Sequence, residues 1–380
     1  MDPFKKLPLE TAFEILTRLP GDTVLDCKSV CRDWRKIVRI VSRYPLFIQK
    51  HLYRLNQPSA AEDSCKLGFL ALTERAYYYF EYNDDQNHEL TEPVKKIREI
   101  NSACIGDGSY SCNGLICLAR DDIESPVCIF NPFTREYVML PELRNHIESI
   151  DKHTNEWDDW SFGFGYISAT NEYKVVGIYG SDSGYLEVYI YTLGTNGWRD
   201  LGRNFSDEFR PKYGYGDVHG SFANGALYWI GNEVQKIVIF DLVEEKFCEH
   251  LAPPPLPPNR NLINQTIGVL DGVLYIALYV EDGCYDIWLL KKKNDNHDKK
   301  GDKHQSFEWS KELRVADNEL LAVTKSGGVL TYSNTAERVW DFKQEVVLRV
   351  FPHKNTFISL KDLGEEQTKK LKSNKGGRKP

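Results

Sequence analysis

The sequence has no long apolar run. Nowhere in its 380 residues do about 18 apolar side chains follow one another, the length that a membrane-spanning helix requires. The first residues, MDPFKKLP, also lack the apolar segment of a secretory signal peptide. We therefore expect a soluble intracellular protein, in the cytoplasm, the nucleus or both, with no membrane partner.

Paired cysteines and an excess of basic charge are missing as well. The nine cysteines include no CxxC pair and no spacing typical of a zinc site, which predicts reduced thiols and no metal. The formal net charge of -7 argues against a general nucleic-acid binder, because such proteins carry a basic surface. We expect no specific nucleic-acid partner.

Motifs of catalysis are absent too. The sequence contains no GxSxG elbow, P-loop, HExxH pair or GxGxxG turn, and its nine histidines lie apart from one another. Cys27, Cys31, Cys112 and Cys117 are expected to pack as small apolar side chains. The sequence therefore predicts a protein that is not an enzyme and uses no cofactor.

What is present begins with a short helical region. In LPLETAFEILTRLPG, residues 7–21, apolar side chains recur at helical spacing, and the closing Pro-Gly pair predicts the end of the helix. Asp22 or Thr23 is expected to cap a second short helix. A third helix is predicted over residues 31–42, and residues 46–53 favour a fourth.

These helices carry more apolar side chains than about 45 residues can bury among themselves. The excess either forms a surface for a partner or packs on the strands that follow. Burying about six to eight such side chains in a partner contributes on the order of 10–20 kcal/mol gross. Association costs roughly 4–15 kcal/mol, so a partner-bound helical region is energetically sound.

The residues of this region resemble the F-box. LPLETAFEILTRLP is followed by VCRDWRKIV, residues 30–38, and both segments agree with the F-box pattern LPxExxxEIxxRLP and VCxxWxxxI. The resemblance implies docking onto a Skp-type adaptor and, through it, a cullin–RING ubiquitin ligase. By position it implies an adaptor-facing surface, or the hinge beneath it, made of Leu7, Pro8, Ile15, Leu16, Leu19, Pro20, Leu25, Val30, Cys31 and Trp34.

Beyond residue 65 the sequence is typical of an all-β domain. A turn followed by an apolar strand recurs in CNGLICLA, ANGALYWIG, LDGVLYIALY and SGGVLTYS. The Asn-Gly and Asp-Gly pairs suit tight hairpins because both residues accept a positive φ. Units of about 50 residues predict a kelch-like β-propeller of about five or six blades. A β-sandwich or an irregular β fold is the alternative.

This part resembles the F-box-associated domain of plant F-box proteins. The segments SCNGLICL, IFNPFTREYVMLP, FGFGYISATNEYKVV and GALYWIG with FDLVEEKF occur in the order of that family. The resemblance implies a domain that recruits a target protein for ubiquitination. Because Tyr and Trp are common interface anchors, the candidate target-binding residues, in loops on one propeller face, are Trp157, Trp160, Tyr213, Tyr215 and Tyr285.

The expected organisation is an α plus all-β fold in four parts. These are a helical F-box domain over 1–55, a linker over 56–64, a β-propeller over 65–363 and a basic flexible tail over 364–380. The predicted function is substrate recognition in an SCF-type ubiquitin ligase. The alternative is a propeller scaffold acting outside a ligase, which requires the apolar helical surface to be buried against the strands.

Overall fold

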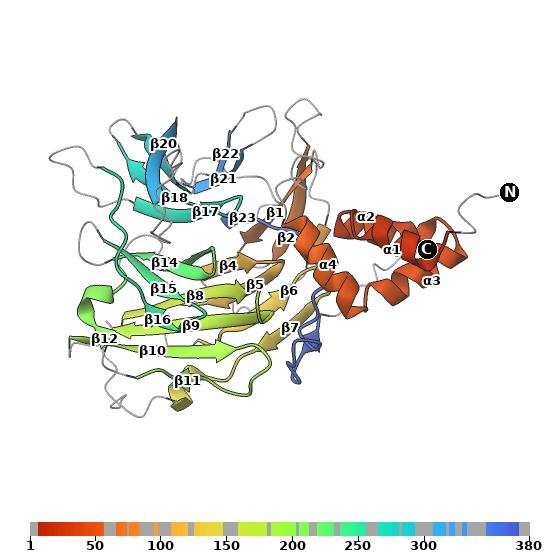
Figure 1. The fold of residues 1–380 in the computed structure, drawn as a ribbon, viewed down its shortest axis with the longest axis horizontal. Coiled ribbons are helices and arrows are strands. Elements are labelled where there is room, and N and C mark those ends of the chain that lie inside the picture. The colour runs from red at the N-terminus through yellow and green to blue at the C-terminus, as the bar shows by residue number, and fades with distance from the viewer. Residues whose placement is uncertain are drawn as a thin grey trace, which may run out of the picture.

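A helical unit, residues 7–56, precedes a larger β domain, and Figure 1 shows the helices gathered at one side of the strands. The computed structural model describes residues 7–56, 66–73, 76–83, 95–97, 108–120, 125–146, 159–180, 184–202, 205–212, 219–231, 236–255, 265–280, 283–292, 307–316, 319–323, 329–332 and 347–371. The linker predicted over 56–64 lies almost entirely outside these residues. The predicted order of helices and strands is confirmed.

Four α-helices and one 3₁₀-helix form the helical unit. Their bounds are α1 Leu9–Leu16, α2 Gly21–Asp26, η2 Cys27–Ser29, α3 Arg32–Val41 and α4 Pro45–Leu55. α3 follows its prediction closely, since Cys31 is its N-cap and Trp34, Val38 and Val41 form its buried face. The capping contact is a hydrogen bond from the backbone N–H of Trp34 to Cys31 Sγ at 3.5 Å.

The start of α2 differs from the sequence prediction. The helix begins at Gly21, and its N-cap is Pro20, which provides no side-chain hydrogen bond. The backbone oxygen of Asn355 lies 2.8 Å from where a Cβ on Gly21 would stand, so only glycine fits this buried position. Asp22 accepts a hydrogen bond from Asn355 Nδ2. The predicted cap by Asp22 or Thr23 is therefore wrong, because the β domain engages this end of the helix.

The β domain is a propeller whose five blades are sheets of four or five strands. The orders are β23-β1-β2-β3, β24-β7-β6-β5-β4, β11-β10-β9-β8 with β12 on β10, β13-β14-β15-β16 and β17-β18-β19-β20. A two-stranded sheet, β21-β22, contacts β17 and β23 and so lies between the fifth blade and the first. These separate sheets confirm the predicted propeller and exclude a sandwich of two packed sheets.

The strand bounds follow the chain. The first three blades contain β1 Lys66–Thr73, β2 Tyr77–Asn83, β3 Lys95–Ile97, β4 Gly108–Cys112, β5 Leu115–Ala119, β6 Cys128–Asn131, β7 Glu136–Met139, β8 Asp159–Ile167, β9 Glu172–Gly180, β10 Tyr185–Thr192, β11 Arg199–Asp200 and β12 Phe205–Ser206. The remaining strands are β13 Ser221–Ala223, β14 Ala226–Ile230, β15 Ile237–Asp241, β16 Lys246–Phe247, β17 Gln265–Leu270, β18 Val273–Tyr279, β19 Tyr285–Lys292, β20 Phe307–Val315, β21 Glu319–Val323, β22 Val329–Tyr332, β23 Val347–Pro352 and β24 Lys369–Lys370. Two further 3₁₀-helices are η4 Leu143–His146 and η5 Asp207–Phe209.

Three of the four predicted hairpin turns are confirmed. Both residues have positive φ in Asn113-Gly114 (52° and 79°), Asn224-Gly225 (50° and 82°) and Asp271-Gly272 (49° and 81°). This pairing of positive φ angles is that of a type I′ turn, whose twist matches the strands on either side. The fourth turn, at Gly327, lies outside the described residues.

Two other hairpins are fixed by an acceptor side chain at their first residue. Asn131 Oδ1 accepts from the N–H groups of Phe133 and Thr134, at 2.9 and 3.2 Å. Asp241 Oδ1 accepts from the two equivalent N–H groups of its own turn, both at 2.8 Å. Such side chains mimic a backbone turn, which explains why IFNPFTREY and IFDLVEEKF fold alike.

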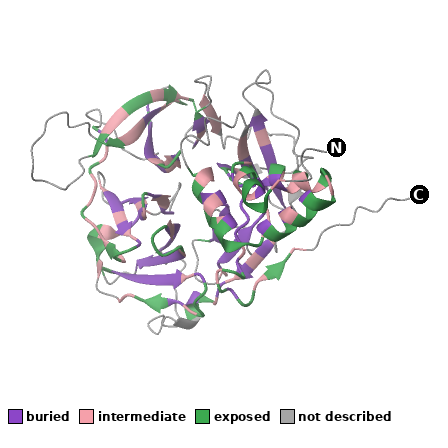
Figure 2. Ribbon diagram, turned by 45° about the vertical axis from the view of Figure 1, so that its right-hand side comes forward, coloured by how far each residue is buried: buried purple, intermediate pink, exposed green. Residues whose placement is uncertain are grey.

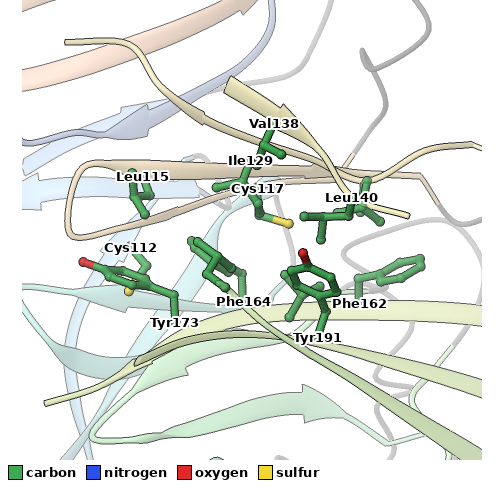
Figure 3. Close-up of a cluster of buried hydrophobic side chains, with 14 of the residues drawn as sticks. Cys112, Leu115, Cys117, Ile129, Val138, Leu140, Phe162, Phe164, Tyr173 and Tyr191 are labelled. Carbon is green, nitrogen blue, oxygen red and sulfur yellow. The ribbon is translucent and has the colours of Figure 1, made fainter. Parts of the chain in front are cut away.

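Side chains of neighbouring blades interdigitate to form the core. In the largest cluster, Leu115, Cys117 and Ile129 of the second blade face Phe162 and Phe164 of the third (Figure 3). Cys112 and Cys117 are buried as the sequence predicts, and burial raises the pKa of both thiols. Cys27 and Cys31 are only partly buried.

The C-terminal part of the chain joins the ring at two places. β23 pairs with β1 in the first blade, and β24 pairs with β7 in the second. Residues 353–368, the C-terminal strap, connect these two strands beside the helices (Figure 1). The predicted domain end at residue 363 is therefore wrong, because residues 364–371 belong to the propeller. Residues 372–380 of the predicted basic tail lie outside the described residues.

Candidate functional site

The inner side of the helical unit shares its core with the propeller. Seven of its buried side chains form one cluster with Phe357 of the C-terminal strap: Ala12, Leu16, Val24, Trp34, Val38, Val41 and Phe47. The Phe357 ring centroid lies 5.8 Å from that of Phe47, 5.4 Å from that of His51 and 5.0 Å from that of Phe133. Phe357 is thus held between α4 and a hairpin turn of the second blade.

Polar contacts fix the same junction. Lys354 Nζ donates to the backbone oxygen of Leu55 at 2.8 Å, at the C-terminal end of α4 where helical carbonyls have no partner of their own. The side-chain amide of Asn56 donates to Asn113 Oδ1 at 2.8 Å. His51 Nε2 lies 2.9 Å from the backbone oxygen of Leu19, and burial lowers the pKa of this imidazole. The helical unit therefore has a defined position on the propeller.

The outer side of the helical unit exposes many apolar side chains. Among the described residues, twelve large hydrophobic side chains are exposed, and seven belong to this unit: Leu9, Ile15, Val30, Ile40, Tyr44, Leu46 and Tyr53. Seven of the twelve in about 50 residues is a higher concentration than in the propeller. Figure 2 shows the exposed and half-buried stretches of the helices. Exposed apolar side chains gathered in this way mark an interaction surface.

One groove opens within this surface. It is lined by Phe13 of α1 and by Leu46, Gln49, Lys50 and Tyr53 of α4. The four α4 residues have the spacing i, i+3, i+4 and i+7, which places them on one helical face. Lys50 also lies over the Phe13 ring, with its Nζ 5.9 Å from the ring centroid.

An ion cluster joins α1 to α4 beside the groove. Glu14 accepts hydrogen bonds from Lys50 Nζ and from Arg54 Nη2, the latter at 2.7 Å. Arg54 Nη1 also donates to the backbone oxygen of Glu14 at 3.1 Å. The hydrogen bonds from Lys50 and Arg54 lower the pKa of Glu14 to about 2.

The Glu14 cluster predicts an acid-sensitive contact between the two helices. Since the folded-state pKa lies below the unfolded value of about 4.3, the contribution of Glu14 is fully present above about pH 4.5 and disappears as the pH falls towards 2. We expect Glu14→Gln to lower the denaturation midpoint at pH 7, and its difference from the wild type to shrink as the pH falls from about 4.5 towards 2. Urea titrations at several pH values measure this, and a difference that stays constant over that pH range would contradict it.

The structure divides the ten predicted adaptor-facing residues into three groups. Leu16 and Trp34 are buried in the shared core, so they support the surface from beneath. The half-buried residues are Leu7, Leu19, Leu25 and Cys31, and the exposed ones are Pro8, Ile15, Pro20 and Val30. Val30 is 60% exposed because it lies at the end of η2, one residue before the α3 cap.

Sequence reasoning missed the part of this surface on α4. Leu46 and Tyr53 are 59% and 66% exposed, whereas Phe47 and His51 between them are buried. The signal was available, since residues 46, 49, 50 and 53 repeat at helical spacing on the face opposite Phe47 and His51. A helix with apolar side chains on two faces needs a partner for each face, and the propeller covers only the face of Phe47 and His51.

Of the five predicted target-binding residues, Trp160 was predicted wrongly. It is 1% exposed and stacks on Tyr179 with ring centroids 4.8 Å apart. The expected exposed loop at Trp157–Trp160 instead enters β8 at Asp159, where Trp160 begins an alternation of core-facing aromatic residues. Tyr285 is half-buried and packs edge-on against Tyr279 at 5.4 Å. Trp157, Tyr213 and Tyr215 lie outside the described residues.

The described residues offer neither a metal site nor a membrane-spanning helix. No group of three or more His, Cys, Asp or Glu side chains is arranged to hold a metal ion there. In the same residues, no helix has the length and apolar character needed to cross a membrane.

A small helical unit with an exposed apolar face, fixed to a β-propeller, defines the F-box class of proteins with a propeller domain. The F-box domain profile matches residues 4–46, and the profile of the F-box associated beta propeller domain matches residues 66–373. The chain therefore belongs to the family of F-box proteins with an F-box-associated β-propeller.

Similar proteins from Arabidopsis thaliana are named F-box or F-box/kelch-repeat proteins. An F-box/kelch-repeat protein is 26% identical over 325 residues, covering 81% of this chain and 79% of the relative. F-box protein CPR1 is 27% identical over 311 residues, covering 76% of this chain and 70% of the relative. The resemblance to plant F-box proteins is confirmed.

Proposed function

We propose that this protein is the substrate-recognition subunit of an SCF-type, cullin–RING ubiquitin ligase in the cytoplasm or nucleus. The helical unit binds a Skp-type adaptor, and the propeller recruits the target protein. The observation that carries the proposal is the apolar outer side of the helical unit, which remains exposed although its inner side is buried against the propeller. A scaffold acting alone would leave this surface uncovered.

The chemical contribution of such a subunit is proximity. When the adaptor and the target are bound to one chain, the encounter between a target lysine and the ubiquitin-loaded carrier enzyme becomes effectively intramolecular. A defined angle between adaptor and target is useful for this purpose. Phe357, Asn355 and Lys354 support it, because they hold the helical unit on the second blade.

For the target we propose the propeller edge that carries Tyr279 and Tyr285. In the fifth blade Tyr279 ends β18 and Tyr285 begins β19, so both lie at the end of the sheet opposite the Asp271-Gly272 turn. The equivalent turn of the second blade, Asn113-Gly114, faces the helical unit and the strap. A target on the Tyr279–Tyr285 edge would therefore be kept apart from the adaptor.

Adaptor binding tests the proposal. Ile15→Asp with Val30→Asp changes two predicted adaptor-facing residues that are exposed, so the chain should fold normally. We expect affinity for the Skp-type adaptor to fall on the order of a hundredfold or more, because two carboxylates would be buried in an apolar interface. Isothermal titration calorimetry with purified chains measures the change.

Val243→Asp with Tyr185→Asp is the matched control. These residues are 59% and 54% exposed and lie on the propeller, so their replacement should leave adaptor affinity unchanged. If the wild type binds no Skp-type adaptor, the receptor function is wrong and a propeller scaffold outside a ligase remains.

A further inference from the structure

Two of the three buried histidines that the structure describes lie at the junction between the helical unit and the propeller. His51 of α4 is 1% exposed, and His353, the first residue of the C-terminal strap, is 3% exposed. The third, His219, precedes β13 within the propeller. Imidazole is the side chain that gains a charge just below neutral pH, so a contact that buries it depends on pH.

His51 has an apolar environment on the helical side of the junction. The ring centroids of Phe47 and Phe357 lie 5.5 and 5.4 Å from that of His51. Its one hydrogen bond to a described residue joins Nε2 to the backbone oxygen of Leu19. Burial lowers the pKa of this imidazole, although the contact with Leu19 opposes the shift. The neutral ring is therefore the form that fits this position.

His353 is enclosed on the propeller side of the junction. Its backbone N–H donates to the oxygen of Gly68 at 2.9 Å, and its ring lies edge-on to that of Tyr79, with centroids 6.3 Å apart. Neither ring nitrogen makes a hydrogen bond of ordinary geometry. Burial lowers the pKa of His353 to about 3, and the nearby amide of Asn355 opposes this shift only in part. A proton on this ring would therefore place an unpaired charge in the junction.

The titratable groups on the elements around the two rings are engaged elsewhere. These groups are Glu14, Asp22, Lys50, Arg54, Tyr79, Glu81 and Lys354. The carboxylate on α1 is bonded to both cations of α4, that on α2 accepts from Asn355, and that on β2 lies 3.4 Å from a tyrosine hydroxyl. The strap lysine donates to the last turn of α4. Within the described part of the chain, no carboxylate forms a hydrogen bond or ion pair with either imidazole, so neither imidazolium would be stabilised.

Both rings act on the same short segment of the strap, residues 353–357. The contacts of this segment reach β1, the end of α4, the start of α2 and the helical core, in the order His353, Lys354, Asn355 and Phe357. A charge on either ring favours a conformation in which the helical unit separates from this segment and the imidazole reaches water. The propeller blades have cores of their own, so the separation is a local opening.

We propose that the junction is sensitive to pH: protonation of His51 and His353 releases the helical unit from the propeller, which stays folded. Release needs no partner, so it is independent of the proposed function. Both folded-state pKa values lie below the unfolded value of about 6.5, so the stabilising contribution is fully present above that pH and is lost as the pH falls below it. Linkage then makes opening about tenfold more frequent per imidazole at pH 5.5 than at pH 7.5, or about a hundredfold for the two.

Hydrogen exchange of the full chain, corrected for the pH dependence of unstructured amides, measures the release. Between pH 7.5 and 5.5 we expect the protection factors of α4 and of residues 353–357 to fall about a hundredfold, while those of β9 change little. Glu14 contributes nothing in this range, because its contact is lost only below about pH 4.5. The variant His51→Gln/His353→Gln has no titratable ring at either site, so its protection should hardly depend on pH. The matched control, His250→Gln, replaces a half-buried propeller histidine and should keep the wild-type response.

Three results would overturn the proposal. In the first, the wild type protects α4 and residues 353–357 equally at the two pH values. In the second, the double variant loses protection on acidification as much as the wild type does. In the third, α4 and β9 lose protection together, which means that acid unfolds the whole chain. If the double variant does not fold at pH 7.5, His51→Gln and His353→Gln alone should each keep about a tenfold response, and a full hundredfold response in both would equally contradict the proposal.

Discussion

A chain that ends after Pro352 is expected to lose adaptor binding although every residue of the helical unit is present. Such a chain lacks the C-terminal strap and β24, and with them Phe357, whose ring packs on Phe47, His51 and Phe133. A helical unit this small is marginal without that contribution. The outer surface that we assign to the adaptor would therefore lose the support beneath it.

The single substitution Phe357→Ala isolates this effect. Phe357 is 5% exposed, so its removal leaves a cavity between α4 and the second blade, and we expect the free energy of unfolding to fall by about 3–5 kcal/mol. Chemical denaturation measures the loss, and adaptor titration at a temperature where the variant is folded measures its effect on binding.

Phe307→Ala is the matched control, because the same residue type on β20 is 42% exposed and its loss should cost less than about 0.5 kcal/mol. If Phe357→Ala unfolds at the same denaturant concentration as the wild type, the strap does not complete the helical core.

Asn131→Ala is expected to have the second large effect. The side-chain amide donates to the backbone oxygens of Thr356 and Ile358, at 3.2 and 2.7 Å, while its oxygen holds the turn at Phe133 and Thr134. Asn131 is completely buried, so its removal leaves two carbonyl and two N–H groups without this partner. We expect a loss of about 3–5 kcal/mol in the free energy of unfolding, by urea denaturation.

Two further variants separate the roles of this amide. Asp241→Ala removes the same turn contacts from a side chain with no contact to the strap, so it should cost only about 1–2 kcal/mol. Asn131→Asp keeps the turn acceptor but places a carboxylate against two carbonyl oxygens. The difference in the free energy of unfolding between Asn131→Asp and the wild type should narrow as the pH falls, since a protonated carboxyl donates a hydrogen bond. If Asn131→Ala and Asp241→Ala lower the free energy of unfolding equally, the contacts of Asn131 with the strap contribute nothing to stability.

Features of the fold set by neighbouring residues were predictable from the sequence. The type I′ turns at Asn113, Asn224 and Asp271 follow from residues that accept positive φ. The helical span of α3 follows from apolar spacing. The two family patterns added the adaptor surface, which the spacing alone could not have assigned to a particular partner.

What could not be predicted depends on contacts between distant parts of the chain. Glu365 looks like the start of a charged tail, yet it is 5% exposed because its carboxylate accepts from the N–H of Gly194 at 2.8 Å. Burial raises the pKa of this carboxyl group. Asp22 is of a residue type that often caps helices, but its carboxylate accepts a hydrogen bond from Asn355, 333 residues later. Trp160 differs, because the alternation of Trp160, Phe162 and Phe164 is present in the sequence and is typical of a strand with one buried face.

The strap also determines when a newly made chain becomes able to bind the adaptor. The helical unit leaves the ribosome before the propeller, but its core lacks Phe357 until the strands from β1 to β23 have been synthesised, and the ring closes only when β23 and β24 reach β1 and β7. A nascent or prematurely terminated chain therefore exposes an incomplete helical core. Only chains translated past Phe357 can complete that core, and only chains translated as far as Leu371 form the contacts of β24 with the second blade. Recognition by the adaptor would then distinguish finished chains from fragments before either reaches a ligase.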